Sequence, residues 1–223
     1  MGLIIYTPAR LDETGSTDTA EADTDTDTDT DTDTDTDTDT DSDTDTDTDV
    51  GLRAPMPGDL VISELMINPS SVSDEDGEWV ELANVSGDDL ELTALTLGDE
   101  GADFYVLEFA GLVLPRGGRL VLCANMVRGE NGGVDCSSEY LYQSFGDGFA
   151  LSNTEDEVVL GLDGGPQLDV VRYGSGVPTG ASLGVDPSCL SVSDNDRAGC
   201  WCEQSGSLSG GDAGNPGAPN RGC

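Results

Sequence analysis

Short segments in which apolar and polar residues alternate follow one another along the chain from about residue 57 onward. Residues 60–67 (LVISELMI) and 78–83 (EWVELA) are the first two. Their length and their β-branched and aromatic residues predict strands. Further strands are expected at residues 90–97, 104–109, 112–114, 119–123, 157–162 and 168–173. Turn-forming residues separate these segments and no long stretch has helical spacing, so the pattern predicts an antiparallel β-sandwich or barrel.

The alternation predicts which side chains of the first strand share a face. Successive side chains of a strand point to opposite sides. One face is therefore expected to hold Val61, Leu65 and Ile67, and the opposite face Leu60, Ile62 and Met66. In the second strand, Trp79 and Val80 point in opposite directions, and the alternation alone does not say which of them faces the main core.

Two turns predict hairpins. Residues 115–118 (PRGG) suit a turn, because proline favours its first inner position and glycine the left-handed one. They are expected to join 112–114 to 119–123 as paired strands. Residues 163–165 (DGG) are expected to join 157–162 to 168–173 in the same way. After Gly174 the strand signals weaken, so we expect the tail to be held by covalent bonds more than by a core.

Residues 23–49 form a strict repeat, with Asp at every odd position and Thr at every even position except Ser42. The segment has no apolar residue to bury, so we expect it to be disordered, and repulsion between carboxylates about 7 Å apart should stiffen it. The chain is therefore divided into a disordered region, 1–56, with a Thr–Asp spacer, and a β-sandwich domain, 57–223. Diffuse Ca²⁺ binding and O-glycosylation are two alternatives for the spacer, but it lacks the Gly and Glu of an EF-hand loop and the Pro of mucin-like stalks.

Composition excludes several classes of function. The chain carries 46 acidic against eight basic residues, a net charge of −38, and has neither His nor Lys. It can form no His-dependent triad, no His-ligated zinc site and no Lys Schiff base. Its charge repels phosphate backbones and anionic membranes, and no run approaches the ~20 apolar residues of a membrane helix. We therefore expect no nucleic-acid partner and no membrane insertion, and a partner that is an unidentified protein or a surface glycan.

The cysteines favour disulfides over a metal site. The six are Cys123, Cys136, Cys189, Cys200, Cys202 and Cys223. None forms a CxxC pair, so we expect no metal or other cofactor, and an oxidising compartment. Cys123 and Cys136 flank a Gly/Asn-rich loop and should pair locally. In the tail we favour Cys189–Cys200 and Cys202–Cys223, with the swapped pairing of Cys200 and Cys202 left open.

The cysteines imply an extracellular or cell-surface location. Residues 1–5 contain only a short apolar stretch, without the basic region or the longer apolar run of a recognisable signal peptide. The export route is therefore not visible in this sequence.

Two sets of carboxylates are candidate sites. Asp74, Glu75 and Asp76 with Glu78 could supply oxygen ligands to Ca²⁺, although their spacing matches no defined loop and a solvated acidic turn is the alternative. A pair drawn from Glu64, Glu78 and Glu81 could act as in a glycosidase if the two lay about 5–9 Å apart. Such residues also accept backbone hydrogen bonds at sheet edges. We expect that second role and no catalytic residue.

Aromatic residues are scarce, at 5% of the chain. Trp79, Trp201 and the tyrosines could form a sugar-binding platform, since rings stack on the apolar faces of sugars. Each is more readily explained as a core residue.

Several segments, taken in order, resemble the lamin-tail domain family. They are 61–69 (VISELMINP), 78–84 (EWVELAN), 114–118 (LPRGG), 151–153, 156–160, 170–173 (VVRY), 180–183 (GASL), 201–202 (WC) and 214–220 (GNPGAPN). The similarity covers nearly all of residues 57–220 and rests on order and spacing. It implies an immunoglobulin-like β-sandwich and no shared catalytic apparatus. Bacterial members of the family resemble parts of secreted or cell-surface proteins; the chromatin-binding role of nuclear lamins should not carry over, because this chain lacks a rod and basic residues.

Two functional hypotheses follow. The first is a non-catalytic structural or binding module, secreted or displayed on the cell surface on the Thr–Asp spacer. The second is a secreted carboxylate-dependent hydrolase or carbohydrate-binding module, with Ca²⁺ as a possible stabilising ion. Two carboxylates that converge with an aromatic ring in one pocket would favour the second hypothesis, whereas glutamates bonded to the backbone would favour the first.

Overall fold

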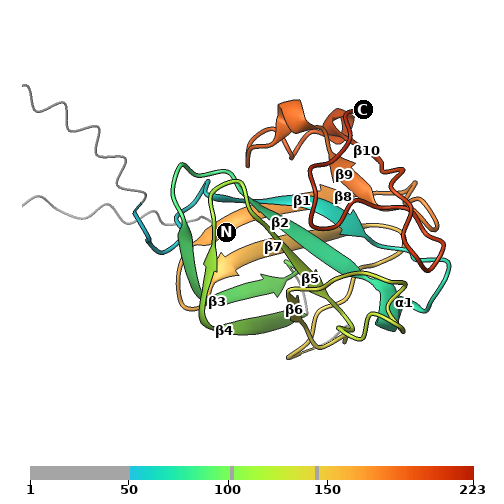
Figure 1. Cartoon of the computed structure of the whole chain (residues 1–223), viewed down its shortest axis with the longest axis horizontal. Coiled ribbons are helices and arrows are strands. Elements are labelled where there is room, and N and C mark those ends of the chain that lie inside the picture. Colours follow the sequence, from blue (N-terminus) through green and yellow to red (C-terminus); the bar gives the residue numbers. More distant parts are fainter. Residues whose placement is uncertain (1–50, 101–102, 144–145) are drawn as a thin grey trace, which may run out of the picture. The chain divides into compact units, whose positions relative to one another are not determined.

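The computed structural model describes residues 51–100, 103–143 and 146–223, and in them ten strands form two sheets that pack face to face (Figure 1). One sheet has the order β10-β9-β1-β2-β5-β6. Its strands are β1 (Leu60–Met66), β2 (Trp79–Asn84), β5 (Arg119–Cys123), β6 (Ser138–Glu139), β9 (Leu183–Val185) and β10 (Trp201–Glu203). The other has the order β4-β3-β7-β8, with β3 (Leu90–Gly98), β4 (Phe104–Leu114), β7 (Asp156–Leu162) and β8 (Gln167–Tyr173). Helix α1 (Asp74–Gly77) and the 3₁₀ turns η1 (Pro187–Cys189) and η2 (Ala198–Cys200) complete these elements.

Aliphatic side chains from both sheets fill the space between them. Leu60, Val80 and Leu122 come from the first sheet, and Leu95 and Leu160 from the second, all in one buried cluster. The edge-to-face pair Tyr140–Phe149 is buried in the same core. The all-β, immunoglobulin-like sandwich expected from the sequence is confirmed. The Thr–Asp spacer and its expected disorder lie outside the described residues.

The predicted faces of β1 are wrong. Leu60, Ile62, Leu65 and Ile67 all belong to the main core, whereas Met66 belongs to a second cluster. The reason is a β-bulge: Ile62 pairs with Leu82 but Glu64 pairs with Glu81, so Ser63 is an extra residue. A bulge resets the alternation. It lets β1 place Leu60, Ile62 and Leu65 in the core, with Ile67 directly after the strand, and every residue of β1 is buried.

The predicted hairpin at residues 115–118 is also wrong. The turn itself forms, because the Gly118 N–H donates to the Pro115 carbonyl at 2.8 Å and Gly117 has a φ of +71°. However, β4 pairs with β3 and β5 pairs with β2, so the turn carries the chain from one sheet to the other. Turn chemistry reverses the chain but does not select the partner strand. The predicted hairpin between β7 and β8 does form, with Gly164 at a φ of +64°.

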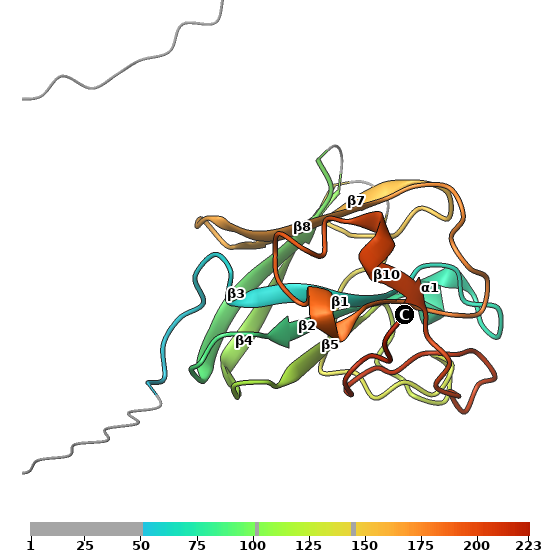
Figure 2. The ribbon, with the colours of Figure 1, turned by 90° about the horizontal axis from the view of Figure 1, so that it is seen from above.

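Two strands in the tail were not predicted. β9 pairs with β1, and β10 pairs with β9, which extends the first sheet beyond β1. Each has only three residues and no clear alternation of apolar and polar residues. Beyond β10, the C-terminal segment lies along the outer face of the sheet beside β1 and β2 (Figure 2). The tail is therefore held by backbone pairing and side-chain hydrogen bonds as well as by disulfides.

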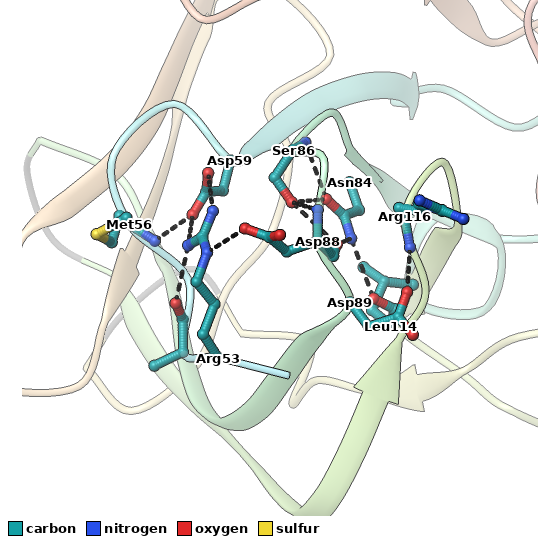
Figure 3. A network of polar contacts seen from close by, with 10 residues as sticks. Arg53, Met56, Asp59, Asn84, Ser86, Asp88, Asp89, Leu114 and Arg116 are labelled. Carbon is teal, nitrogen blue, oxygen red and sulfur yellow. Dashed lines mark hydrogen bonds and ion pairs between the residues drawn. The ribbon is translucent and has the colours of Figure 1, made fainter. Parts of the chain in front are cut away.

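An ionic network holds the beginning of the described chain (Figure 3). The Arg53 guanidinium donates to both carboxylate oxygens of Asp59 and, through Nε, to Asp88 at 2.6 Å. The Arg53 backbone also bridges to Leu90 of β3. Arg53, which lies four residues before the predicted domain start at residue 57, therefore already contacts the sandwich. The boundary at residue 57 stays a prediction. Among the described residues, no helix combines the length and apolar character needed to cross a membrane.

Candidate functional site

The bulge in β1 turns two polar residues toward the outer face of the six-stranded sheet. Ser63 and Glu64 meet Glu81 of β2 there, and all three have no exposed surface. Alternation explains the third, because Val80 and Leu82 on either side of Glu81 point into the core. Buried carboxylates are costly unless they are hydrogen-bonded, so their partners define what this face does.

Glu64 is bonded to the tail of the chain. Its Oε1 accepts hydrogen bonds from the Ser182 hydroxyl and from the Asn215 backbone N–H, the latter at 2.8 Å. Its other oxygen, Oε2, has no hydrogen-bond partner among the described residues. Burial raises the pKa of Glu64 to about 7, against the lowering effect of these hydrogen bonds.

Glu81 makes a denser set of contacts. Its Oε1 accepts from Arg119 Nη1 at 2.6 Å and from the Ser63 hydroxyl at 2.7 Å, and its Oε2 accepts from the Gly217 N–H at 2.6 Å. Burial raises the pKa of Glu81, and the Arg119 charge opposes that rise. The charge-assisted hydrogen bond from Gly217 to Glu81 holds the C-terminal segment on the sheet. Glu64 holds the same segment two residues earlier, at Asn215.

Glu78 lies apart from that pair and binds a different loop. Its Oε2 accepts the Leu151 backbone N–H at 2.8 Å, and its Oε1 has no partner among the described residues. Burial, and then the nearby charges of Asp74, Asp156 and Asp103, raise the pKa of Glu78 to about 9. The three glutamates singled out in the sequence thus all accept backbone N–H groups, and none has exposed surface that could meet a substrate.

The proposed Ca²⁺ ligands do not form a cage. Asp74 accepts a hydrogen bond from the Asn153 side chain at 2.7 Å, and Asp76 accepts from Ser73 and Asn125. Glu78 binds the interior instead. In residues 51–100, 103–143 and 146–223, no three or more carboxylates, thiols or imidazoles are grouped so that they could hold a metal ion. Helix α1 is therefore an acidic turn tied to neighbouring loops.

The two tryptophans do not share a surface. Trp79 is 1% exposed and packs with Met66, Val121 and Val134, on the sheet face opposite Val80. Trp201 is half-buried and donates its indole N–H to the Asn195 carbonyl at 2.6 Å. The pair cannot make a sugar-stacking platform together.

The six cysteines form three disulfides, which are Cys123–Cys136, Cys189–Cys200 and Cys202–Cys223. These are the pairs favoured above rather than the swapped alternative. The first ties β5 to the loop that follows it. The other two tie η1 to η2 and β10 to the end of the chain.

Three polar residues that bond to the backbone of β1 were not singled out from the sequence. The Asn195 amide donates to Asp169 at 2.7 Å and to the Ile62 carbonyl, and Asp169 accepts the Ile62 N–H. The Asn220 amide donates to the Ser63 and Val185 carbonyls. Asn220 lies in the GNPGAPN segment that carries the family resemblance. Nothing in the local sequence identifies the partners of Asp169 and Asn195, which lie 107 and 133 residues from Ile62.

Comparison with known proteins agrees with the architecture. A search of curated proteins gives no match. The family model for the Lamin Tail Domain matches residues 53–175, more than half of the chain, from Arg53 through β8. The likeness seen in residues 176–220 stays a prediction. By its fold and by this match, the chain belongs to the lamin tail domain family.

Proposed function

We propose that this protein is a non-catalytic binding or structural module, secreted or displayed on the cell surface. Its folded domain would be held away from its attachment point by the Thr–Asp spacer, residues 23–49. An immunoglobulin-like lamin tail domain supports a structural or binding role. Three disulfides are compatible with an oxidising, extracellular setting.

The observation that carries the proposal is that Glu64, Glu78 and Glu81 are buried and accept backbone N–H groups. A hydrolase of the carboxylate type needs two carboxyl groups that reach one substrate. Here Glu64 and Glu81 are neighbours, but both are fully buried and both bind backbone N–H groups of the C-terminal segment. Glu78 binds a separate loop. These hydrogen bonds support a role of the three glutamates in holding the domain together rather than in hydrolysing a substrate.

Surface display can be tested on intact producing cells. A membrane-impermeant protease is expected to digest the chain without lysis. Thiol alkylation under denaturing conditions is expected to label no cysteine before reduction and all six after it. Protection from the protease together with six free thiols would overturn the proposed location. The non-catalytic assignment would be overturned by hydrolysis of a polysaccharide or ester panel that Glu64→Gln abolishes while the folded domain persists.

Carbohydrate binding is a second candidate that one observation favours. Trp201, Tyr173 and Arg172 line a cavity of about 230 Å³ where β8 faces β9 and η2. Aromatic rings beside a polar group suit a sugar ring. Indole fluorescence should change when the correct oligosaccharide is added, and Arg172→Gln should weaken that response. An unchanged spectrum across a broad glycan panel would remove this candidate.

A further inference from the structure

Two neighbouring cavities lie among the loops beside α1 and β6, and together they are called the acidic groove. Their volumes are about 200 and 380 Å³, and both have Tyr142 in their lining. The acidic residues Asp99, Asp103 and Asp156 line the smaller one. The acidic residues Glu75, Asp76, Glu130 and Glu139 line the larger one. The loop between β5 and β6 runs beside α1 (Figure 1), and Asn125 of that loop donates to Asp76 at 2.9 Å.

The acidic groove also carries exposed apolar side chains. Val127 and Leu141 line the larger cavity and are 53% and 51% exposed. Met126, next to Val127, is 45% exposed. Single exposed apolar residues need no explanation, but two that line one cavity, with a third next to them in sequence, mark a surface suited to binding.

Among the residues that the structure describes, no basic one lines either cavity. Arg128, close in sequence, pairs with Asp135, and Arg172 pairs with Glu100. Burial, followed by the neighbouring Asp99, raises the pKa of Asp103 to about 6. The described lining of the groove is therefore acidic and includes no basic side chain.

Charge decides what can occupy the acidic groove. The Thr–Asp spacer is itself acidic, and a second copy of the chain carries the same −38. Both are repelled, as is a nucleic acid. A cationic partner is attracted, and the apolar side chains favour one that also presents an apolar anchor.

We propose that the acidic groove binds a cationic segment of another protein, in which Lys or Arg residues flank an apolar side chain. The basic residues face the carboxylates, and the apolar side chain contacts Val127 and Leu141. This inference rests on the proposed role as a binding module and names the chemistry of the partner.

The test uses the full chain and a fluorescent peptide in which Arg and Leu alternate, with a photoreactive group at its centre. Anisotropy at physiological salt measures affinity, and mass spectrometry locates the cross-links. Binding is expected to be weaker for a peptide of Arg and Ser, and cross-links are expected within residues 124–142. Cross-links confined to residues 23–49 would overturn the proposal, because they would show only attraction to the spacer.

Matched variants separate the groove from the overall charge. Glu75→Gln with Glu130→Gln removes two groove charges and should weaken binding about fivefold. Glu91→Gln with Glu108→Gln removes two exposed charges on β3 and β4, outside the groove, and should change affinity less than about twofold. Leu141→Ser should weaken binding of the Arg–Leu peptide, whereas Val113→Ser, on an exposed residue of β4, should not.

Equal weakening by both charge pairs would overturn the proposal. So would a groove that takes only Ca²⁺, seen as a rise in melting temperature at millimolar Ca²⁺ that Glu75→Gln with Glu130→Gln abolishes, without peptide binding. Surface display and intact disulfides are measured separately, so failure of peptide binding leaves the proposed location of the module standing.

Discussion

The Glu64 carboxylate accepts the backbone N–H of Asn215 at 2.8 Å, across 151 residues of sequence. A buried side chain of the central strand β1 therefore holds the end of the chain on the sheet. The family match ends at residue 175, but the domain continues through β9, β10 and this segment. Its outer face is thus assembled from the two ends of the folded sequence.

Removing the Glu64 carboxylate should destabilise the domain. Glu64→Ala leaves the Ser182 hydroxyl and the Asn215 N–H without their acceptor, which costs about 1–3 kcal/mol for each buried group. Chemical denaturation should show this loss. Hydrogen exchange at Asn215 should become faster, while exchange in β7 should change less. Unchanged exchange at Asn215 would mean that the segment does not depend on Glu64.

The pH dependence of stability should reflect Glu64 and Glu78. Burial raises both pKa values above the ordinary 4.5, to about 7 and about 9, so the folded domain binds these protons more tightly than the unfolded chain. Their contribution is complete below about pH 4.5 and is lost as the pH rises through those values.

Glu78→Gln should therefore lose less stability than the parent chain between pH 5 and pH 8. Melting temperatures at the two values measure the difference. Glu75→Gln, on the exposed part of α1, should follow the parent chain. If the parent and Glu78→Gln have equal pH slopes, the Glu78 carboxyl does not stay protonated in the folded domain.

Arg119 should be required for the stability of the folded domain, because it is the counter-ion of the buried Glu81. Their side chains are 10% and 0% exposed, and Arg119→Met leaves a charge in the interior without its counter-ion. The expected loss is about 3–5 kcal/mol. Adding Glu81→Gln removes that charge. The double variant should therefore lose less unfolding free energy than the sum of the losses of the two single variants. Additive losses in urea unfolding would show that the two residues are not coupled.

The disulfide at the end of the chain should stabilise the segment over Glu64 and Glu81. Replacing Cys202 and Cys223 by Ser opens a loop of 21 residues and should cost about 3 kcal/mol. Exchange at Asn215 and Gly217 should rise. The same replacement at Cys123 and Cys136 should affect the loop between them, and equal exchange profiles for the two variants would contradict this assignment.

A methyl group at Gly214 should also displace this segment. A Cβ there would lie 3.0 Å from the Ser182 Oγ, 3.1 Å from Trp79 and 3.4 Å from Glu64 Oε1. Gly214→Ala should lower the melting temperature. Gly87→Ala, where no atom lies within 4 Å of an added Cβ, should have little effect. Equal melting temperatures for the two variants would show that the segment is loosely placed.

Local signals were sufficient for some elements and misleading for others. The DGG turn predicted the β7–β8 hairpin because the two strands are neighbours in sequence and in the sheet. The PRGG turn predicted a false hairpin because its flanking strands pair with β3 and β2 instead. For β9 and β10, the strand state comes from pairing with β1, and their own three-residue sequences give little signal.

The candidate sites could also be predicted only in part from the sequence. The glutamates could be identified as unusual because they interrupt apolar segments, and the expected backbone hydrogen bonds are present. Their partners, Leu151, Asn215 and Gly217, could not be identified, because hydrogen bonds across more than 70 residues leave no mark in a local pattern. The acidic groove could be predicted only in part, since Glu75 and Asp76 were singled out with Asp74 and Glu78, but Glu130 and Glu139 were not.

The sequence alone determined the strand-forming segments of β1 to β5, β7 and β8, the all-β class, the family and the absence of His- and Lys-dependent chemistry, because alternation, turn residues and composition are local or additive properties. Only the tertiary structure decided the bulge at Ser63, the partners of β5 and the burial of Glu64 and Glu81 under the C-terminal segment. Those features depend on contacts between residues that are far apart in sequence. The free energy of burying and hydrogen-bonding these groups is gained only when both sheets and the tail have come together.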